Sequence, residues 1–187
     1  MNVWTCTMSS QQLIKTPVAA CIGYFDGLHL GHMTLVKKTL EKAKELNAES
    51  ALITFEPDPW VIIKQVQDVQ HLTTMKQRQK LAEKAGIDHF IILDFTKEMS
   101  SLSETEFVNL LKRNLDVKAM ICGFDFHYGF KGTGNATTLA KHGFEVVCVD
   151  SINDDKGKIS STRICECIDE GQIEEANALL GYAYTIE

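Results

Sequence analysis

The stretch Val18–Leu40, VAACIGYFDGLHLGHMTLVKKTL, combines a short apolar run, a glycine-rich turn and the start of a helix. Its first residues, VAACIG, are typical of a strand buried on both faces. Beyond the turn, Leu35, Val36, Leu40, Ala43 and Leu46 recur at helical spacing. The stretch therefore predicts a buried strand followed by an amphipathic helix that begins near Gly31.

The same alternation continues along the chain. A helix is predicted over Phe107, Leu110, Leu111 and Leu115, with Ser103 and Glu106 as its capping box. Residues Ser160–Gly181 predict a short helical tail, broken at Gly171 and stopped by Gly181. Further short apolar runs predict strands at Ser50–Phe55, His89–Phe95, Lys118–Phe124 and Glu145–Asp150. We therefore predict an α/β fold, with a parallel sheet of about five strands, helices on both faces and ligands at the carboxyl ends of the strands.

Length and composition restrict the class of protein. The 187 residues predict a single domain over residues 1–187, and a net charge of −6 argues against nucleic acid or an anionic membrane as partner. Cys21, Cys122 and Cys148 lie in apolar runs, so we expect buried thiols of a reducing, cytoplasmic compartment. No segment has the length of a signal peptide core or a membrane span.

The turn carries two histidines at the predicted start of the helix. His29 and His32 are three residues apart and lie on one side of the first turn, and Gly31 between them has no Cβ. A helix N-terminus is itself an anion site. The pattern predicts phosphate ligands that donate hydrogen bonds, although two exposed histidines in an ordinary turn would look the same. Neither GxxxxGK[ST] nor GxGxxG occurs in the chain.

A second motif, ISSTR at Ile159–Arg163, follows a turn rich in Gly, Lys and Asp. Ser160, Ser161 and Thr162 can cap a helix and donate to phosphate oxygens, and Arg163 is a permanent, fork-shaped cation. An ordinary N-cap with an exposed arginine is the alternative.

Together, five ordered motifs resemble those of the FMN adenylyltransferase module of the bacterial bifunctional riboflavin kinase/FAD synthetase family. They are GYFDGLHLGH, TFEPDP (Thr54–Pro59), GFDFHYGFKGTGN (Gly123–Asn135), ISSTRI and ANALLGYAY (Ala176–Tyr184). The resemblance implies the Rossmann-like nucleotidyltransferase fold of the HxGH superfamily. It also implies transfer of AMP from ATP to FMN, giving FAD and pyrophosphate, with Mg2+ whose ligands the sequence does not identify. We expect the family's riboflavin kinase domain to be absent.

The resemblance also implies roles for individual residues. The catalytic candidates are His29, His32 and Arg163. The nucleotide-binding candidates are Gly23, Tyr24, Phe25, Asp26, Gly27, His29, Gly31, His32, Ser160, Ser161, Thr162 and Arg163. The flavin-binding candidates are Thr54, Glu56, Pro57, Asp58, Asp125, Phe126, Tyr128 and Asn135.

Four positions depart from the family pattern. Cys165, His127 and Tyr182 stand where the family commonly has arginine, and Asp58 stands where it has histidine. Each change removes a positive or potentially positive group, so we expect a weakened anion site. A divergent paralogue that binds flavin or adenine nucleotide without turnover is therefore one alternative. Another is a nucleotidyltransferase for a different phosphorylated acceptor, such as phosphopantetheine, nicotinate mononucleotide or a cytidylyl-transfer substrate, although the aromatic GFDFHYG loop argues against it.

Overall fold

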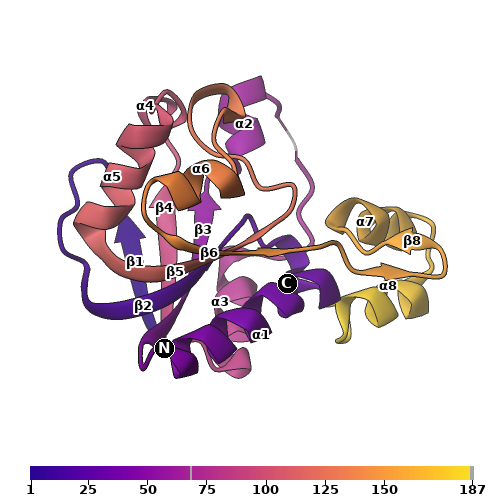
Figure 1. Ribbon diagram of the computed structural model, residues 1–187. Helices are drawn as coiled ribbons and strands as arrows, with labels where there is room; N and C mark the ends of the chain where they lie inside the picture. The colour runs from indigo at the N-terminus through magenta and orange to yellow at the C-terminus, as the bar shows by residue number, and fades with distance from the viewer. Residues whose placement is uncertain (68, 186–187) are drawn as a thin grey trace.

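A six-stranded parallel sheet forms the centre of the computed structural model, which describes residues 1–67 and 69–185 (Figure 1). The strand order is β1-β4-β3-β2-β5-β6. The strands are β1 (Asn2–Cys6), β2 (Ile14–Ile22), β3 (Glu49–Glu56), β4 (His89–Asp94), β5 (Leu115–Gly123) and β6 (Glu145–Val149). All five predicted strands are confirmed. Leu115, expected at the end of a helix, instead begins β5.

The sixth strand, β1, was not predicted from the sequence. It pairs with β4 from Asn2 opposite His89 to Cys6 opposite Leu93, at one edge of the sheet. Of its five residues, only Cys6 is buried, so it lacks the apolar run that marks the central strands.

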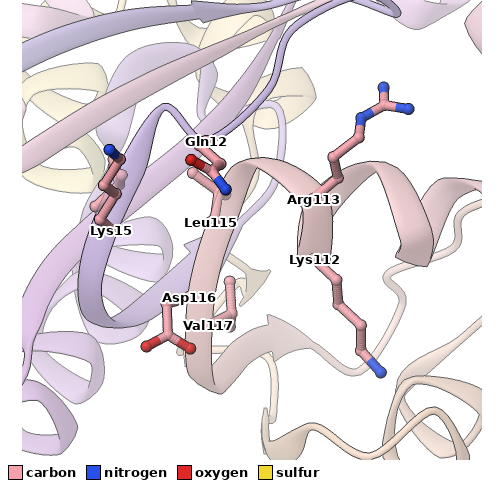
Figure 2. Close-up of a pocket in the computed structure, with 8 residues that line it drawn as sticks. Gln12, Lys15, Lys112, Arg113, Leu115, Asp116 and Val117 are labelled. Atoms are coloured by element: carbon pink, nitrogen blue, oxygen red, sulfur yellow. The ribbon is translucent and has the colours of Figure 1, made fainter.

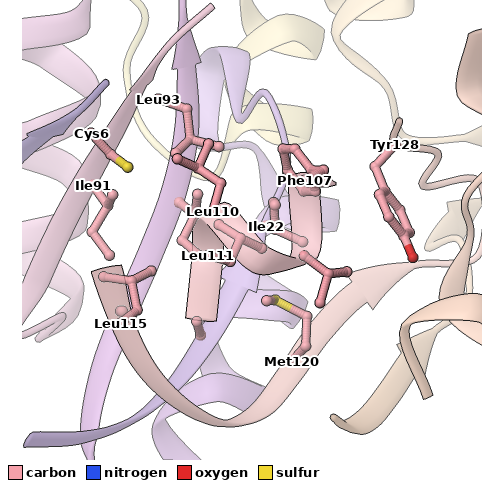
Figure 3. Packing of buried hydrophobic residues seen from close by; sticks show 14 of the residues in the cluster. Cys6, Ile22, Ile91, Leu93, Phe107, Leu110, Leu111, Leu115, Met120 and Tyr128 are labelled. Atoms are coloured by element: carbon pink, nitrogen blue, oxygen red, sulfur yellow. The ribbon is translucent and has the colours of Figure 1, made fainter. Parts of the chain in front are cut away.

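Two apolar cores cover the two faces of the sheet. Because side chains alternate along a strand, Val18 and Ile22 of β2 face one core, while Ala19 and Cys21 face the other. Helices α5 (Glu104–Asn114) and α6 (Ala136–Lys141) pack in the first core, part of which is drawn in Figure 3. Helices α1 (Leu30–Glu45) and α3 (Met75–Ala85) pack in the second. Short helices α2 (Pro59–Lys64) and α4 (Lys97–Ser100) follow β3 and β4.

A small lobe with its own core completes the molecule and lies to the right in Figure 1. It contains the two-stranded ribbon β7 (Asn153–Asp154) and β8 (Gly157–Lys158) and the helices α7 (Ser161–Asp169) and α8 (Ile173–Leu180). Gly171 and Gly181, with φ of +74° and +80°, separate and end the two helices. The predicted helical tail and its break are therefore confirmed.

The order of the strands locates a crevice. From β2 the chain adds β3 and β4 on one side and then crosses to add β5 and β6 on the other side. In sheets of this kind ligands bind where the order reverses, outside the carboxyl ends of the strands. The loops after β2 and β5 flank this point, and they carry the GYFDG and GFDFHYG sequences.

The burial of the cysteines agrees with the prediction only in part. Cys21 and Cys122 are fully buried, but Cys148 is exposed, contrary to the prediction. Cys148 lies on β6, which is one of the two edge strands and is covered less completely than β2 and β5. All six cysteines are free thiols.

Candidate functional site

The turn after β2 is held in an unusual backbone conformation. Phe25 and Gly27 have φ of +57° and +77°; Phe25 precedes the short 3-10 helix η1 (Asp26–Leu28), and Gly27 lies within it. A Cβ at Gly27 would lie 2.8 Å from the Leu72 side chain. Glycine is therefore needed at this position both for the backbone and for packing.

A buried ion pair fixes this turn from a distance. The Asp26 carboxylate accepts hydrogen bonds from the backbone N–H groups of Leu72 (2.9 Å) and Thr73 (3.0 Å) and from the Arg78 guanidinium (3.0 Å). Arg78 is 2 % exposed and also donates to the Tyr24 carbonyl at 3.1 Å. Asp26, a nucleotide-binding candidate, therefore has both carboxylate oxygens engaged inside the protein.

Sequence reasoning missed Arg78 and Thr73. The stretch around them shows a capping box, Thr74 with Gln77, at the start of α3, and the structure forms it. However, nothing in the local sequence distinguishes a buried arginine in the first turn of a helix from a solvent-exposed one. Its partner is 52 positions earlier in the chain.

The two histidines stack on each other at the start of α1. His29 is the N-cap of the helix, and its Nδ1 accepts the His32 N–H at 3.4 Å. The two rings are 3.7 Å apart between centroids, with an interplanar angle of 19°. A Cβ at Gly31 would lie 3.0 Å from His29 Cε1 and 3.5 Å from the Ile159 carbonyl oxygen. Gly31 therefore leaves room for the His29 ring, in addition to the predicted close approach of a phosphate.

Both imidazoles are neutral at pH 7. Burial lowers the pKa of His29 to about 4, and burial also holds the pKa of His32 well below its usual value. Because His29 Nδ1 accepts a hydrogen bond, its proton is on Nε2. His32 Nδ1 is buried and has no hydrogen-bond partner among the described residues. The pair can therefore offer N–H donors to an anion, but no positive charge.

The ISSTR motif reaches the same turn through one hydroxyl. Ser160 caps α7, and its side chain accepts the Arg163 N–H at 3.3 Å. Ser161 donates from Oγ to the Asp26 carbonyl at 3.0 Å, which ties the lobe to η1. Thr162, next in the motif, is exposed at the start of α7.

Arg163 is directed elsewhere. Its guanidinium makes two 2.7 Å hydrogen bonds to the Asp154 carboxylate and one of 3.2 Å to Glu175. The hydrogen bonds from Arg163 lower the pKa of Asp154 to about 2. The carboxylates of β7 and α8 thus bind the guanidinium of this catalytic candidate.

The TFEPDP segment contributes a hydrogen bond to the turn after β2 and a buried carboxylate. Thr54 donates from Oγ1 to the Tyr24 carbonyl at 2.7 Å. Asp58 caps α2 by accepting the Trp60 N–H at 2.8 Å, and it is 6 % exposed. His71 Nδ1 lies 3.9 Å from Asp58 and 3.8 Å from Asp26. An imidazole from another part of the chain therefore faces the carboxylate at position 58. Glu56 and Pro57 are exposed at the end of β3.

The GFDFHYG loop divides into an anchored and an exposed part. Tyr128 is buried, its hydroxyl lies 2.8 Å from Thr138 Oγ1, and a Cβ at Gly134 would lie 2.5 Å from its ring. Asn135 caps α6. Both flavin-binding candidates therefore use their side-chain oxygens in hydrogen bonds to α6. Phe126 stacks on Tyr128 with 6.0 Å between centroids, while Asp125 is exposed.

Two further contacts complete the turn's surroundings. The Tyr182 hydroxyl donates to the Gly27 carbonyl of η1. Tyr182 stands where the family commonly has arginine, and this bond links the ANALLGYAY motif to the turn. Gly23 donates its N–H to the Ile53 carbonyl at 3.1 Å. The motifs from β3, α7 and the C-terminal segment thus all bond to the turn after β2.

A hollow in the described structure lies at the opposite end of the sheet, near where β2 and β5 begin (Figure 2). It has a volume of about 530 Å³ and is lined by Gln12, Ile14, Lys15, Lys112, Arg113, Leu115, Asp116 and Val117. Arg113 donates to the carbonyls of Met8 and Ser10, and Lys112 donates to that of His142. Because its basic side chains point in different directions, we do not assign a ligand to this hollow.

None of the helices in the described part of the chain is both long and apolar enough to cross a bilayer.

Comparison with protein families finds a match to the family described as FAD synthetase over residues 11–163. A Listeria monocytogenes bifunctional riboflavin kinase/FMN adenylyltransferase is 40 % identical over 168 residues, which is 88 % of this chain and 54 % of the relative. A putative enzyme of the same description from Geobacillus thermodenitrificans is 30 % identical and covers 93 % of this chain and 95 % of its own. The chain thus spans about half the length of the first of these relatives.

Solved structures agree in fold. A Streptococcus pneumoniae structure described as a macrolide-efflux protein has a TM-score of 0.86 and 28 % identity, covering 98 % of this chain and 72 % of that one. Pantothenate synthetase from Thermus thermophilus has a TM-score of 0.50 at 14 % identity, covering 95 % and 80 %. The second similarity extends to the nucleotidyltransferase-like fold alone.

Proposed function

Because this chain belongs to the FAD synthetase family, we propose that it transfers the adenylyl group of ATP to FMN and releases pyrophosphate. The observation that carries the proposal is the stacked pair of neutral histidines at the start of α1, beside the point where the strand order reverses. Donors at a helix N-terminus suit a phosphate chain.

The reaction needs no general base. A phosphate oxygen of FMN, already an anion, forms a bond to the α-phosphorus of ATP. The bond from that phosphorus to the oxygen bridging to the β-phosphate breaks, and pyrophosphate leaves with the electron pair. The protein's task is then to align the two anions and to stabilise the charge that develops. We assign the donors to His29, His32 and the first N–H groups of α1.

Mg2+ is expected to arrive with the nucleotide. The described residues contain no group of three or more His, Cys, Asp or Glu side chains that could hold a metal. Mg2+ is commonly bound through substrate phosphates, water and only one or two carboxylates. The donor set therefore fits a metal carried by ATP, and when bound it would neutralise phosphate charge.

The exposed aromatic side chains suit the flavin. Trp60 is 54 % exposed on α2, and Phe126 lies half-buried in the loop after β5. We propose that these side chains and Asp125 border the isoalloxazine ring of FMN, because flat aromatic ligands stack on such surfaces. Tyr128 and Asn135 would act by holding the loop.

The test is incubation of the purified chain with FMN, ATP and Mg2+, with FAD followed by chromatography and pyrophosphate by a coupled assay. We expect both products in equal amounts. Pyrophosphate release only with phosphopantetheine or nicotinate mononucleotide would favour another acceptor.

A second candidate function is binding of FMN or adenine nucleotide without turnover. It is favoured by the commitment of Arg163 to Asp154 and Glu175. FMN binding by fluorescence quenching, with no FAD formed, would support it over adenylyl transfer.

His32→Ala tests the assigned donors. We expect turnover to fall on the order of a hundredfold or more, as is typical when one transition-state donor is removed. Thermal unfolding should change little. His142→Ala, at the end of α6, is the matched control and should retain full activity. Undiminished FAD formation by His32→Ala would remove the histidine pair from the mechanism.

A further inference from the structure

The site described above contains donors but little free positive charge. Its two histidines are neutral. Arg78 is buried against Asp26, and Arg163 is bound by Asp154 and Glu175. A triphosphate carries several negative charges, so a site that binds one needs a cation that can leave its partner in the protein.

Lys158 is located where such a cation is needed. It is the last residue of β8 and directly precedes Ile159, whose carbonyl oxygen lies 3.5 Å from the position a Cβ of Gly31 would occupy. The ribbon therefore brings the residue that follows Lys158 against the start of α1. Consistent with this placement, the charge of Lys158 contributes to lowering the pKa of both His29 and His32.

Lys158 is held by an exposed ion pair that a phosphate ligand can replace. Its Nζ lies 2.7 Å from Asp125 Oδ2 and 5.0 Å from the centroid of the Phe124 ring. The side chains of Lys158 and Asp125 are 46 % and 58 % exposed. Exposed ion pairs contribute little to stability, so a phosphate can replace the carboxylate at small cost. An ammonium group has three donors and can also bind both partners together.

We propose that Lys158 binds the polyphosphate chain of the nucleotide substrate beside the histidine pair, and that Asp125 holds its ammonium group when no nucleotide is bound. The inference rests on the proposed function for the identity of the nucleotide, but not for the binding of polyphosphate. It also assigns the GFDFHYG loop and the β7–β8 ribbon a joint role, because the ion pair is a direct link between them.

Inorganic tripolyphosphate is the probe, and calorimetry on the full chain at low ionic strength measures its Kd. We expect Lys158→Gln to weaken binding by about tenfold or more, the usual effect of losing one hydrogen bond between charged groups. Lys158→Arg should retain most of the affinity. The control is Lys156→Gln on the same ribbon, whose Nζ lies 2.6 Å from Glu175; it should change Kd by less than about twofold, as expected for an exposed pair.

Asp125→Asn tests the resting partner. It frees the ammonium group, so tripolyphosphate should bind more tightly than to the wild type. This gain should shrink in the Asp125→Asn, Lys158→Gln double variant, because neighbouring groups that share a partner are not additive. Equal gains in both backgrounds would overturn the role given to Asp125.

The outcomes separate this inference from the proposed function. Tripolyphosphate binding that depends on Lys158, in a chain that forms no FAD, would support the inference and contradict the adenylyltransferase. An unchanged Kd in Lys158→Gln, or no binding by the wild type, would overturn the inference. Normal FAD formation by Lys158→Gln with an unchanged KM for ATP would likewise overturn it while the proposed function stands.

Discussion

Single residues at the turn after β2 have several structural and chemical roles that cannot be inferred from the residue type alone. His29 is a helix cap, a stacking partner and a potential donor at once. Its low pKa means that the folded chain resists protonation of this ring, whereas the unfolded chain does not. The chemistry of the site is therefore coupled to the stability of the fold.

That coupling predicts how stability depends on pH. Between the unfolded pKa of His29, 6.5, and its folded pKa, about 4, the unfolded chain binds more protons than the folded chain. The free energy of unfolding should therefore fall as the pH drops through this range, with a contribution from His29 of up to about 3 kcal/mol. Urea unfolding at pH 7 and pH 4.5 measures it.

His29→Asn is the matched variant, because asparagine caps helices well and does not titrate. Its unfolding free energy should fall less than that of the wild type over the same pH interval. An equal loss in the two proteins would contradict the assignment, and would attribute the pH dependence to other groups such as His32 or the paired carboxylates.

At the scale of elements, the site depends on α3 although α3 contributes no candidate residue to it. The contact of Arg78 with Asp26 joins this helix to η1, and the pair is buried. Breaking a buried pair from one side leaves a charge without compensation, which costs more than the pair contributes.

We therefore expect Arg78→Met to lower the free energy of unfolding by about 3 kcal/mol or more. Urea unfolding at pH 7 measures the change. Arg113→Met is the control: Arg113 is exposed and donates to two backbone carbonyls, so its loss should cost about 1 kcal/mol or less. Similar losses in both variants would mean that breaking the Asp26–Arg78 pair costs no more free energy of unfolding than losing an exposed arginine.

Elements also show how far sequence reasoning reaches. Apolar runs and capping boxes are local, so the central strands and the start of α5 could be predicted. The edge strand β1 lacks an apolar run, and the exposure of Cys148 depends on β6 being an edge. The family resemblance singled out three segments that bond to the turn after β2. It did not predict the carboxylates that bind Arg163, because ion pairing between separate elements leaves no local pattern.

At the scale of the whole molecule, the lobe of α7 and α8 is attached to the sheet domain at the turn. Ser161 and Tyr182 donate to the carbonyls of Asp26 and Gly27, and Leu180 packs near Gly27. Two hydrogen bonds and an apolar contact thus attach the lobe to the turn that precedes the histidines.

Tyr182→Phe removes one of these contacts while keeping the ring. We expect the free energy of unfolding to fall by about 1 kcal/mol, the typical net value of a hydrogen bond, and hydrogen exchange to rise in α8. Mass spectrometry of deuterium uptake measures the second effect. Tyr184→Phe is the control, because the bond from Tyr184 to Asn177 uses its backbone N–H. Faster exchange spread evenly over the chain would argue against a local attachment.

The separation of the molecule into three cores has an evolutionary consequence. Asp58, His127, Cys165 and Tyr182, the four positions that depart from the family pattern, all lie outside the two cores that cover the sheet. Mutations at these positions thus leave the packing of the sheet unchanged, and their effect on folding is confined to the periphery, where Tyr182 and Cys165 pack against the core of the lobe. Changes in ligand binding at these four positions can therefore accumulate during evolution while the sheet that positions the site keeps its packing.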